Sequence, residues 1–485
     1  MFRTAFAAIA CSTILAGTAA AETRIAIDRD HPIGTIQPEI YGQFLEHLGT
    51  QVYDGIWVGQ DSAIPNTDGI RDDVFGALDA LSIPVIRWPG GCYADQYHWR
   101  DGIGAQGART PRVNLEWGGT AEPNGFGTHE FFNLAERLGA KTYLNVNLGT
   151  GTPTEAADWL EYITTDGDGQ LAQLRRANGR EAPWVIDYLS IGNETWGCGG
   201  NMRPDYYADL YAHWATFMKT GNTRPKMIIS GSHNGNMAYS DSILDHRAMR
   251  GLSDGISLHY YTLPTGDWSE HGAALGFPES DWAATMDRTL VMDQLITDQI
   301  AMIDTHEHLS DDFGLYVDEW GTWYDIEDGA PALNQPSTIR DAVVAALNFN
   351  IFHAHADRVP MTNIAQMVNV LQAMKTVDRD LVNLARAYNL SRLGVFFKVE
   401  MPSTMPNLLA GLRIASTLAV IGVTVGELVG GNVGLGFLIS YGGGQANAAM
   451  VFNAIVLLTV IGIILYTAIA RVEERVLHYL PKAQS

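Results

Sequence analysis

The stretch "DYLSIGNE", residues 187–194, is a short apolar run that ends in an amide and a carboxylate. Helical spacing of apolar residues follows several such runs, as in residues 128–140 and 338–356. Eight runs of this kind alternate with helical patterns, which predicts a (β/α)₈ barrel whose strand ends carry the chemistry. The other seven are "YGQFLEH" (41–47), "PVIRWPG" (84–90), "KTYLNVNLG" (141–149), "KMIISGSH" (226–233), "GISLHYY" (255–261), "LYVDEWG" (315–321) and "PMTNIAQM" (360–367).

Two of the predicted strand ends carry carboxylates in positions that suit acid–base chemistry. Glu194 ends the fourth strand and Glu319 ends the seventh, so the two can face each other across the mouth of a barrel. Such a pair suits glycoside hydrolysis, in which one carboxyl protonates the leaving oxygen and the other attacks the anomeric carbon. Asp318 precedes Glu319, but alternation along a strand turns it to the other face, so we expect a structural role for it.

The motifs around these carboxylates resemble a known family. In order along residues 33–374, they are similar to the catalytic barrel of the α-L-arabinofuranosidases of glycoside hydrolase family 51. The resemblance implies a TIM barrel that removes terminal non-reducing α-L-arabinofuranosyl residues from arabinan- or arabinoxylan-type glycans. It implies an exo-acting, retaining double displacement without a cofactor. The stretches that carry it are "YGQFLEHLG", "VIRWPGGCYADQYHWRDGIG", "FGTHEFFNLAERLGA", "IGNETWGCGG", "SLHYYT", "YVDEWGTWYD" and "AQMVNVLQAM".

The same resemblance implies roles for individual residues. Glu194 would be the acid/base, Glu319 the nucleophile, and Asn193 a hydrogen-bond partner of the sugar 2-hydroxyl. His259 could equally be a core histidine or a substrate contact, and Tyr260 and Tyr261 compete for one role, for which we prefer Tyr261. The subsite for the terminal arabinofuranose would be lined by Glu46, Arg87, Cys92, Tyr261 and Gln366, with Trp117 near its rim.

The chemistry of the neighbouring residue types supports these roles independently. Arg87 can keep the nucleophile ionised through a charge-assisted hydrogen bond. Glu194 must begin protonated, so its pKa must be raised. A nearby carboxylate and an aromatic wall of Trp196 and Tyr261 would raise that pKa.

The remaining sequence signals predict neither a metal site nor a nucleic-acid partner. The histidine pairs at 306/308 and 353/355 are spaced two apart, so on a helix they face different directions. "GGNVGLG" at 430–436 lacks the Lys-Ser/Thr of a phosphate loop. A net charge of −23 without a basic stripe argues against nucleic acid. Whether Cys92 and Cys198 pair stays open.

The N-terminal end reads as a targeting segment followed by a short connection. Residues 1–21 have the basic start, apolar middle and small-residue end of a secretory signal, with cleavage after Ala21. Residues 22–39 are expected to form one or two orphan strands, and residues 40–374 the catalytic domain. Family 51 enzymes continue into a C-terminal β-sandwich that takes in such strands, and we expect this chain to lack it.

Residues 375–485 change in character, with nine Lys and Arg against six Asp and Glu and no Trp. The stretch 384–402 resembles the coupling helix of inner-membrane permeases of binding-protein-dependent ABC transporters, although Asn389 stands where a glycine is usual. Apolar runs at 413–430 and 448–470 predict two transmembrane helices in contact with membrane lipid.

Because such a permease has five or six spans, we expect a truncated fragment without an ATPase partner. The whole chain is then expected to be an exported, membrane-attached enzyme. The alternative is an ABC-type transport component that carries an inactive barrel.

Overall fold

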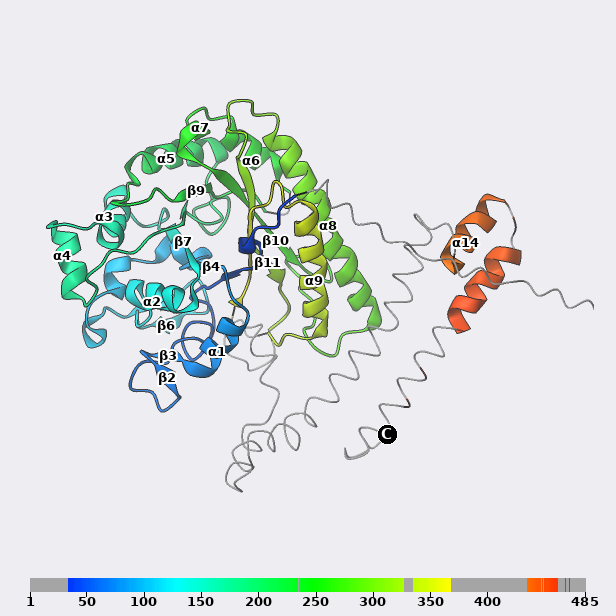
Figure 1. The fold of residues 1–485 in the computed structure, drawn as a ribbon, viewed down its shortest axis with the longest axis horizontal. Helices are drawn as coiled ribbons and strands as arrows, with labels where there is room; N and C mark the ends of the chain where they lie inside the picture. Colours follow the sequence, from blue (N-terminus) through cyan, green and yellow to red (C-terminus); the bar gives the residue numbers. More distant parts are fainter. Residues whose placement is uncertain are drawn as a thin grey trace, which may run out of the picture. The chain divides into compact units, whose positions relative to one another are not determined.

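The computed structural model describes residues 34–233, 235–326, 335–367, 434–445, 447, 449–460, 467 and 471. The chain divides into two compact units, of which one is Ile33–Thr376 and the other combines Met1–Pro32 with Val377–Ser485. The first unit contains the barrel and all of the candidate site (Figure 1).

Eight parallel strands close into a barrel in the order β1-β12-β11-β10-β9-β8-β7-β4. Each coincides with one of the eight predicted stretches, so the barrel prediction is confirmed. The strands are β1 (Gly42–Phe44), β4 (Val85–Trp88), β7 (Lys141–Val146), β8 (Tyr188–Ile191), β9 (Lys226–Ile229), β10 (Gly255–Thr262), β11 (Gly314–Thr322) and β12 (Met361–Ile364).

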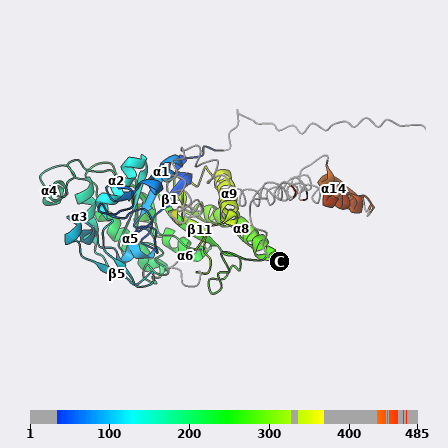
Figure 2. The ribbon, with the colours of Figure 1, turned by 90° about the horizontal axis from the view of Figure 1, so that it is seen from below.

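Helices lie around the outside of the barrel (Figure 1). Figure 2 shows the long helix α8 beside α9, and the two pack together. The helices of this unit are α1 (Asp72–Ala80), α2 (Thr128–Leu138), α3 (Pro153–Thr164), α4 (Gln170–Ala177), α5 (Pro204–Phe217), α6 (Met237–Leu244), α7 (Met249–Leu252), α8 (Glu279–Ile303) and α9 (Ile339–Ala354). The 3-10 helix η1 (Pro38–Tyr41) leads into β1. The loop after β1 forms the ribbon of β2 (Asn66–Thr67) with β3 (Ile70–Arg71). The loop after β4 forms the ribbon of β5 (Arg112–Asn114) with β6 (Thr120–Glu122) and the 3-10 helices η2 (Cys92–Gln96), η3 (Trp99–Gly102) and η4 (Gln106–Ala108).

Local sequence explains the helix ends next to the barrel. At the start of α2 the Glu130 carboxylate accepts a hydrogen bond from Gly127 N at 2.9 Å, and Gly139 ends the helix with a φ of +65°. Thr152 caps α3 by accepting from Glu155 N, with Pro153 in the first helical position. These caps fix where each helix begins after its strand.

The barrel interior is filled by side chains from several strands, which pack in one cluster: Val85, Tyr143, Ile228, Tyr316 and Met361. Every residue of β10 is buried, as expected for a parallel strand covered on both faces. The pairing of β10 with β11 places His259 opposite Glu319, after a register irregularity between Ser257 and His259. The irregularity is one extra residue in β11, because Ser257 pairs with Tyr316 whereas His259 pairs with Glu319.

Some predictions for the ends of the chain fall outside the described residues. Most of the predicted strands at 22–39 lie there; the described part, residues 34–39, forms no strand and enters η1. The signal segment, the coupling-helix segment and the first predicted span also lie outside. We also expected the chain to lack the C-terminal β-sandwich, and that expectation likewise falls on residues outside the described ones.

The second unit contains α14 (Leu435–Gly444) and a helix over residues 449–460. The second predicted span, 448–470, overlaps that helix. Among the described helices none combines the length and the apolar character needed to cross a membrane.

Candidate active site

The two predicted catalytic carboxylates meet at the mouth of the barrel. Glu194 follows β8, and Glu319 lies within β11. One carboxylate oxygen of each, together with a ring nitrogen of His259, lie within 4.8 Å of one another. Residues 125 positions apart in the chain therefore share one site.

Glu319 is held by two donors. Arg87 Nη1 donates to its Oε2 at 2.9 Å, and the Tyr261 hydroxyl donates to its Oε1 at 2.9 Å. Both bonds stabilise negative charge on this carboxylate. The Tyr260 hydroxyl instead donates to the carbonyl of Arg288 at 2.6 Å. Both competing tyrosines border the pocket, but only the Tyr261 hydroxyl donates to Glu319.

Arg87 is fully buried and joins four strands or strand ends. Besides Glu319, its guanidinium donates to Asn193 Oδ1 at 2.6 Å and to Asn145 Oδ1 at 3.2 Å. Burial alone would lower the pKa of Arg87, but the carboxylates of Asp318 and Glu319 outweigh burial and raise that pKa above its usual range. The guanidinium is therefore a fixed positive charge beside Glu319.

Glu194 occupies a backbone conformation that few non-glycine residues adopt, with a φ of +43°. Such a conformation costs on the order of 1–3 kcal/mol and persists only where neighbours enforce it. Burial raises the pKa of the Glu194 carboxyl, while a 2.8 Å hydrogen bond to His259 Nδ1 works in the opposite direction. Burial outweighs the hydrogen bond, so the pKa of the Glu194 carboxyl remains above its usual value.

Strict alternation along the strand predicts that Asp318 turns away from the site. In the structure its carboxylate instead reaches a residue of the site. Its Oδ1 lies 3.1 Å from His259 Nε2, and its Oδ2 accepts from the Tyr143 hydroxyl at 2.6 Å. A register irregularity in the pairing of β11 with β12, between Val317 and Trp320, spans this position. Consecutive carboxylates therefore both reach His259.

His259 is the link between the acidic groups. Burial would lower its pKa, but the carboxylates of Glu319, Asp318 and Glu194 raise it to about 10. The ring nitrogens of His259 lie against protein carboxyl groups, as for a core histidine, and the residue also borders the pocket, as a substrate contact would, so both interpretations remain open.

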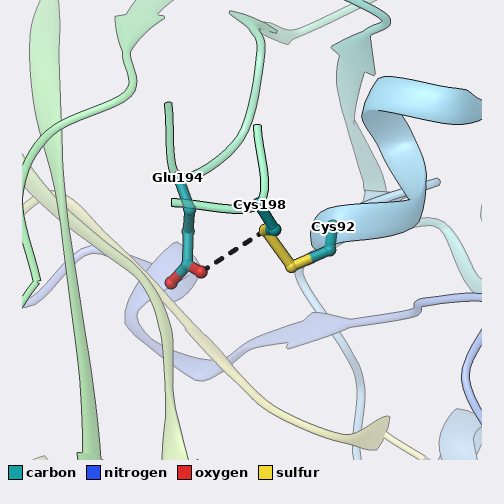
Figure 3. A group of neighbouring side chains, drawn as sticks. All are labelled: Cys92, Glu194 and Cys198. Atoms are coloured by element: carbon teal, nitrogen blue, oxygen red, sulfur yellow. Dashed lines mark hydrogen bonds between the residues drawn. A yellow bond between two sulfur atoms is a disulfide. The ribbon is translucent and has the colours of Figure 1, made fainter. Parts of the chain in front are cut away.

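Cys92 and Cys198 form a disulfide beside Glu194 (Figure 3). Glu194 Oε2 lies 3.7 Å from Cys198 Sγ. A disulfide sulfur carries no proton, so this contact is a hydrogen bond only when the Glu194 carboxyl is protonated and donates. The sulfur therefore favours the neutral acid.

Glu46 lies behind the pocket in a ring of N–H donors. Trp117 Nε1 donates to its Oε1 at 2.8 Å, and Gln366 Nε2 donates to its Oε2 at 3.3 Å. Gln51 Nε2 in turn donates to Gln366 Oε1. Burial first, and the charge of Glu319 second, raise the pKa of Glu46 to about 8.

A pocket of about 450 Å³ opens above these residues. Of the predicted site residues, six line it and the other four (Glu46, Arg87, Asn193 and Gln366) are buried next to it. The six are Cys92, Trp117, Glu194, His259, Tyr261 and Glu319; the sequence did not single out a further set that lines the mouth, namely His233, Trp268, His271 and Trp323. His233 ends a predicted strand stretch, which is the signal that could have identified it.

Two groups of side chains in the described part of the chain have the spacing of metal ligands. One contains both sulfurs of the disulfide, and metals bind thiolates rather than disulfides. The other, Glu194 with His259 and Glu319, is already joined by internal hydrogen bonds and borders the Arg87 cation. Neither arrangement favours a metal.

A barrel with two carboxyl groups at its mouth, one held by cationic and hydroxyl donors and the other with a raised pKa, has the arrangement of a glycoside hydrolase. Comparison with known proteins makes this specific. Residues 77–271 match the α-L-arabinofuranosidase 1 domain and residues 318–392 the α-L-arabinofuranosidase C-terminal domain. Residues 360–478 match the inner membrane component of binding-protein-dependent transport systems.

Relatives cover most of the chain. An intracellular exo-α-L-arabinofuranosidase of Bacteroides ovatus is 46% identical over 401 residues, which are 82% of this chain and 76% of that protein. The GH51 arabinofuranosidase of Xanthomonas axonopodis pv. citri is 46% identical in structure comparison, with a TM-score of 0.67 over 70% of this chain and 68% of that one. The Thermotoga maritima α-L-arabinofuranosidase, solved as an arabinose complex, is 31% identical with a TM-score of 0.57 over 69% and 65%.

The chain belongs to the α-L-arabinofuranosidases of glycoside hydrolase family 51. The resemblance on which the expected activity rested is thereby confirmed. Its C-terminal part matches a transport membrane component in sequence, and this match overlaps the arabinofuranosidase match over residues 360–392.

Proposed function

We propose that Glu319 is the nucleophile and Glu194 the acid/base of an exo-acting, retaining double displacement on terminal α-L-arabinofuranosyl residues. The spacing of the carboxylates is the observation that carries this proposal. Their oxygens lie within 4.8 Å of each other. Retaining enzymes separate the two carboxyl groups by about 5–5.5 Å, whereas inverting enzymes leave about 6.5–9.5 Å for a water molecule.

The surroundings of each carboxylate support its role in the first step. Glu319, with Arg87 and Tyr261 donating to its oxygens, attacks the anomeric carbon. Glu194 gives its proton to the leaving glycosidic oxygen, and His259 stabilises the carboxylate that results. The sugar is then bound covalently to Glu319.

In the second step Glu194 acts as a base. It removes a proton from a water molecule, which attacks the anomeric carbon and displaces the Glu319 carboxylate. Two inversions leave the configuration unchanged. Asn193 accepts from Arg87 through its Oδ1 and donates to Cys198 Sγ through its Nδ2 at 4.0 Å, so the second Nδ2 proton is the one that can donate to the sugar 2-hydroxyl.

The shape of the site supports a substrate with a terminal sugar and a longer glycan behind it. Polar side chains gather at the base of the pocket, where Glu46 remains protonated at neutral pH and can donate to a sugar hydroxyl. The mouth is aromatic, and the Trp323 ring contacts both Trp117 and Trp268. Aromatic faces pack well against sugar rings of arabinan or arabinoxylan.

The test uses two aryl α-L-arabinofuranosides that differ in the leaving group. Glu319→Ala should lose nearly all activity on both. Glu194→Ala should lose far more activity with phenol than with 4-nitrophenol as the leaving group, because only the former needs protonation. Glu161→Ala, on the exposed face of α3, is the control, and equal behaviour of Glu161→Ala and Glu194→Ala would contradict the assignment.

For the rest of the chain, we propose that the signal-like segment directs export of the barrel. The C-terminal tail then anchors the protein to the membrane and takes no part in transport. Three observations support it: the signal-like residues 1–21, the Cys92–Cys198 disulfide and the match to a transport membrane component. The disulfide suits an oxidising compartment. Protease added to spheroplasts should digest the barrel. A barrel protected until lysis would favour the intracellular location stated for the Bacteroides ovatus relative, and with it the transport alternative.

A further inference from the structure

Asp95 is a buried carboxylate for which the proposed reaction has no use. It lies on η2, the 3-10 helix that also carries Cys92, and is 2% exposed. In the described part of the chain no cationic side chain forms an ion pair with it. Burial raises the pKa of Asp95 to about 7, against the effect of the backbone N–H groups that face it. A buried acid without a salt bridge is costly and needs an explanation.

The hydrogen bonds of Asp95 supply that explanation. Its Oδ1 accepts from Leu148 N at 2.8 Å and Gly149 N at 2.9 Å, in the loop after β7. Its Oδ2 accepts from Asn193 N at 2.9 Å, at the end of β8. One carboxylate therefore ties together the loops that follow three neighbouring strands, β4, β7 and β8.

The hydrogen bond from Asn193 N to Asp95 Oδ2 holds the backbone one residue before Glu194. Glu194, at a φ of +43°, is the next residue in the chain. The same turn packs tightly on Asp95: a Cβ on Gly199 would lie 2.9 Å from Asp95 Oδ2 and 1.9 Å from the Asn193 carbonyl oxygen. The direction of the Glu194 side chain thus depends on contacts that Asp95 makes.

We propose that Asp95 is a positioning residue, which holds the Asn193–Glu194 turn so that the Glu194 carboxyl reaches the leaving oxygen. This inference rests on the proposed role of Glu194 as the acid/base. The disulfide from Cys92 to Cys198 fastens the same helix to the far side of the same turn (Figure 3). The two attachments together fix both sides of the turn.

The test is Asp95→Asn in the full chain. An amide has one accepting atom and one donating group, so at least one of the three backbone N–H groups meets another donor. If Glu194 is displaced, turnover with a phenyl leaving group should fall about 100-fold, and turnover with 4-nitrophenol less than about tenfold. Azide should raise turnover of the activated substrate, because it attacks the anomeric carbon without base assistance, displaces Glu319 and leaves α-L-arabinofuranosyl azide.

Asp187→Asn is the matched control. Asp187 Oδ2 accepts from Thr142 N at 2.9 Å and so joins β8 to β7 at the opposite end of the same strands. It should lower stability without changing the dependence on the leaving group. If Asp95→Asn lowers both substrates equally, or responds to azide no more than Asp187→Asn, the proposal is wrong.

Two further measurements separate the possible failures. Glu194→Ala, assayed alongside, must show the leaving-group dependence; if it does not, the proposed function fails rather than the role of Asp95. Asp95→Ser provides a second variant if Asp95→Asn does not fold. Failure of both to fold, while Asp187→Asn folds, would overturn the proposal, because Asp95 would then serve the fold as a whole.

Discussion

Removal of one oxygen atom, in Tyr261→Phe, tests how Glu319 is held. The Tyr261 hydroxyl donates to Glu319 Oε1 at 2.9 Å, while its ring packs edge-on against Trp268 and Trp323 at centroid distances of 5.7 and 5.2 Å. The phenylalanine ring keeps those aromatic contacts, so the variant removes the hydrogen bond alone. Hydrogen bonds to charged groups contribute about 1.5–3 kcal/mol. At about 1.36 kcal/mol for each factor of ten, kcat/KM should fall roughly 10- to 150-fold.

The assay is the steady-state hydrolysis of phenyl and 4-nitrophenyl α-L-arabinofuranosides. Both substrates should be affected alike, because the nucleophile attacks whichever leaving group departs. Tyr260→Phe is the matched control on the same strand, since its hydroxyl donates to the Arg288 carbonyl instead. It should change kcat/KM by less than about threefold, because although Tyr260 also borders the pocket its hydroxyl bonds a neutral backbone carbonyl and not Glu319. Equal losses in the two variants would refute the reasoning.

Three further outcomes follow from the buried groups. Glu46→Gln should raise the free energy of unfolding above pH 8 by on the order of a few kcal/mol, measured by urea unfolding. The pKa of Glu46 is about 8 in the folded state and near 4.5 in the unfolded state, so the stability of the wild type falls as the pH rises from about 4.5 to about 8. His259→Asn should move the alkaline limb of the kcat/KM profile to higher pH, because His259 lowers the pKa of Glu194 and its loss lets the acid keep its proton longer. Cys92→Ser/Cys198→Ser should lower the free energy of unfolding by about 4–5 kcal/mol, the chain-entropy value for a loop of about 100 residues, and a variant as stable as the wild type in urea would contradict it.

The barrel could be predicted because its signals are local and repeated. Each strand is an apolar run of a few residues that ends in a polar group, and covered parallel strands such as β10 leave little other choice. The catalytic carboxylates could be found for the same reason, since a barrel presents its strand ends at one face.

The contacts of Asp318 and Asp95 could not be predicted from the sequence. The pairing irregularity that spans Asp318 shifts register at a single position and leaves no periodic trace. Asp95 lies on the short helix η2, and its three backbone partners are 53 to 98 positions away in the chain. The Cys92–Cys198 pair depends on the same long-range approach of two loops. Sequence pattern fixes strands and helices, but such contacts arise only once the barrel has closed.

Glu319, Glu194 and Glu46 share one site, yet a different set of neighbours surrounds each carboxyl group. Glu319 has the Arg87 guanidinium and a hydroxyl as donors, which favour the anion. Glu194 has an imidazole and a disulfide sulfur, one able to exchange a proton and the other able only to accept it. Glu46 has neutral indole and amide donors, which are too weak to offset burial, so it stays protonated at neutral pH. The division of labour between nucleophile, acid/base and sugar-binding group therefore follows from the type of donor beside each carboxyl, and exchange of donors should exchange protonation states before it changes the fold.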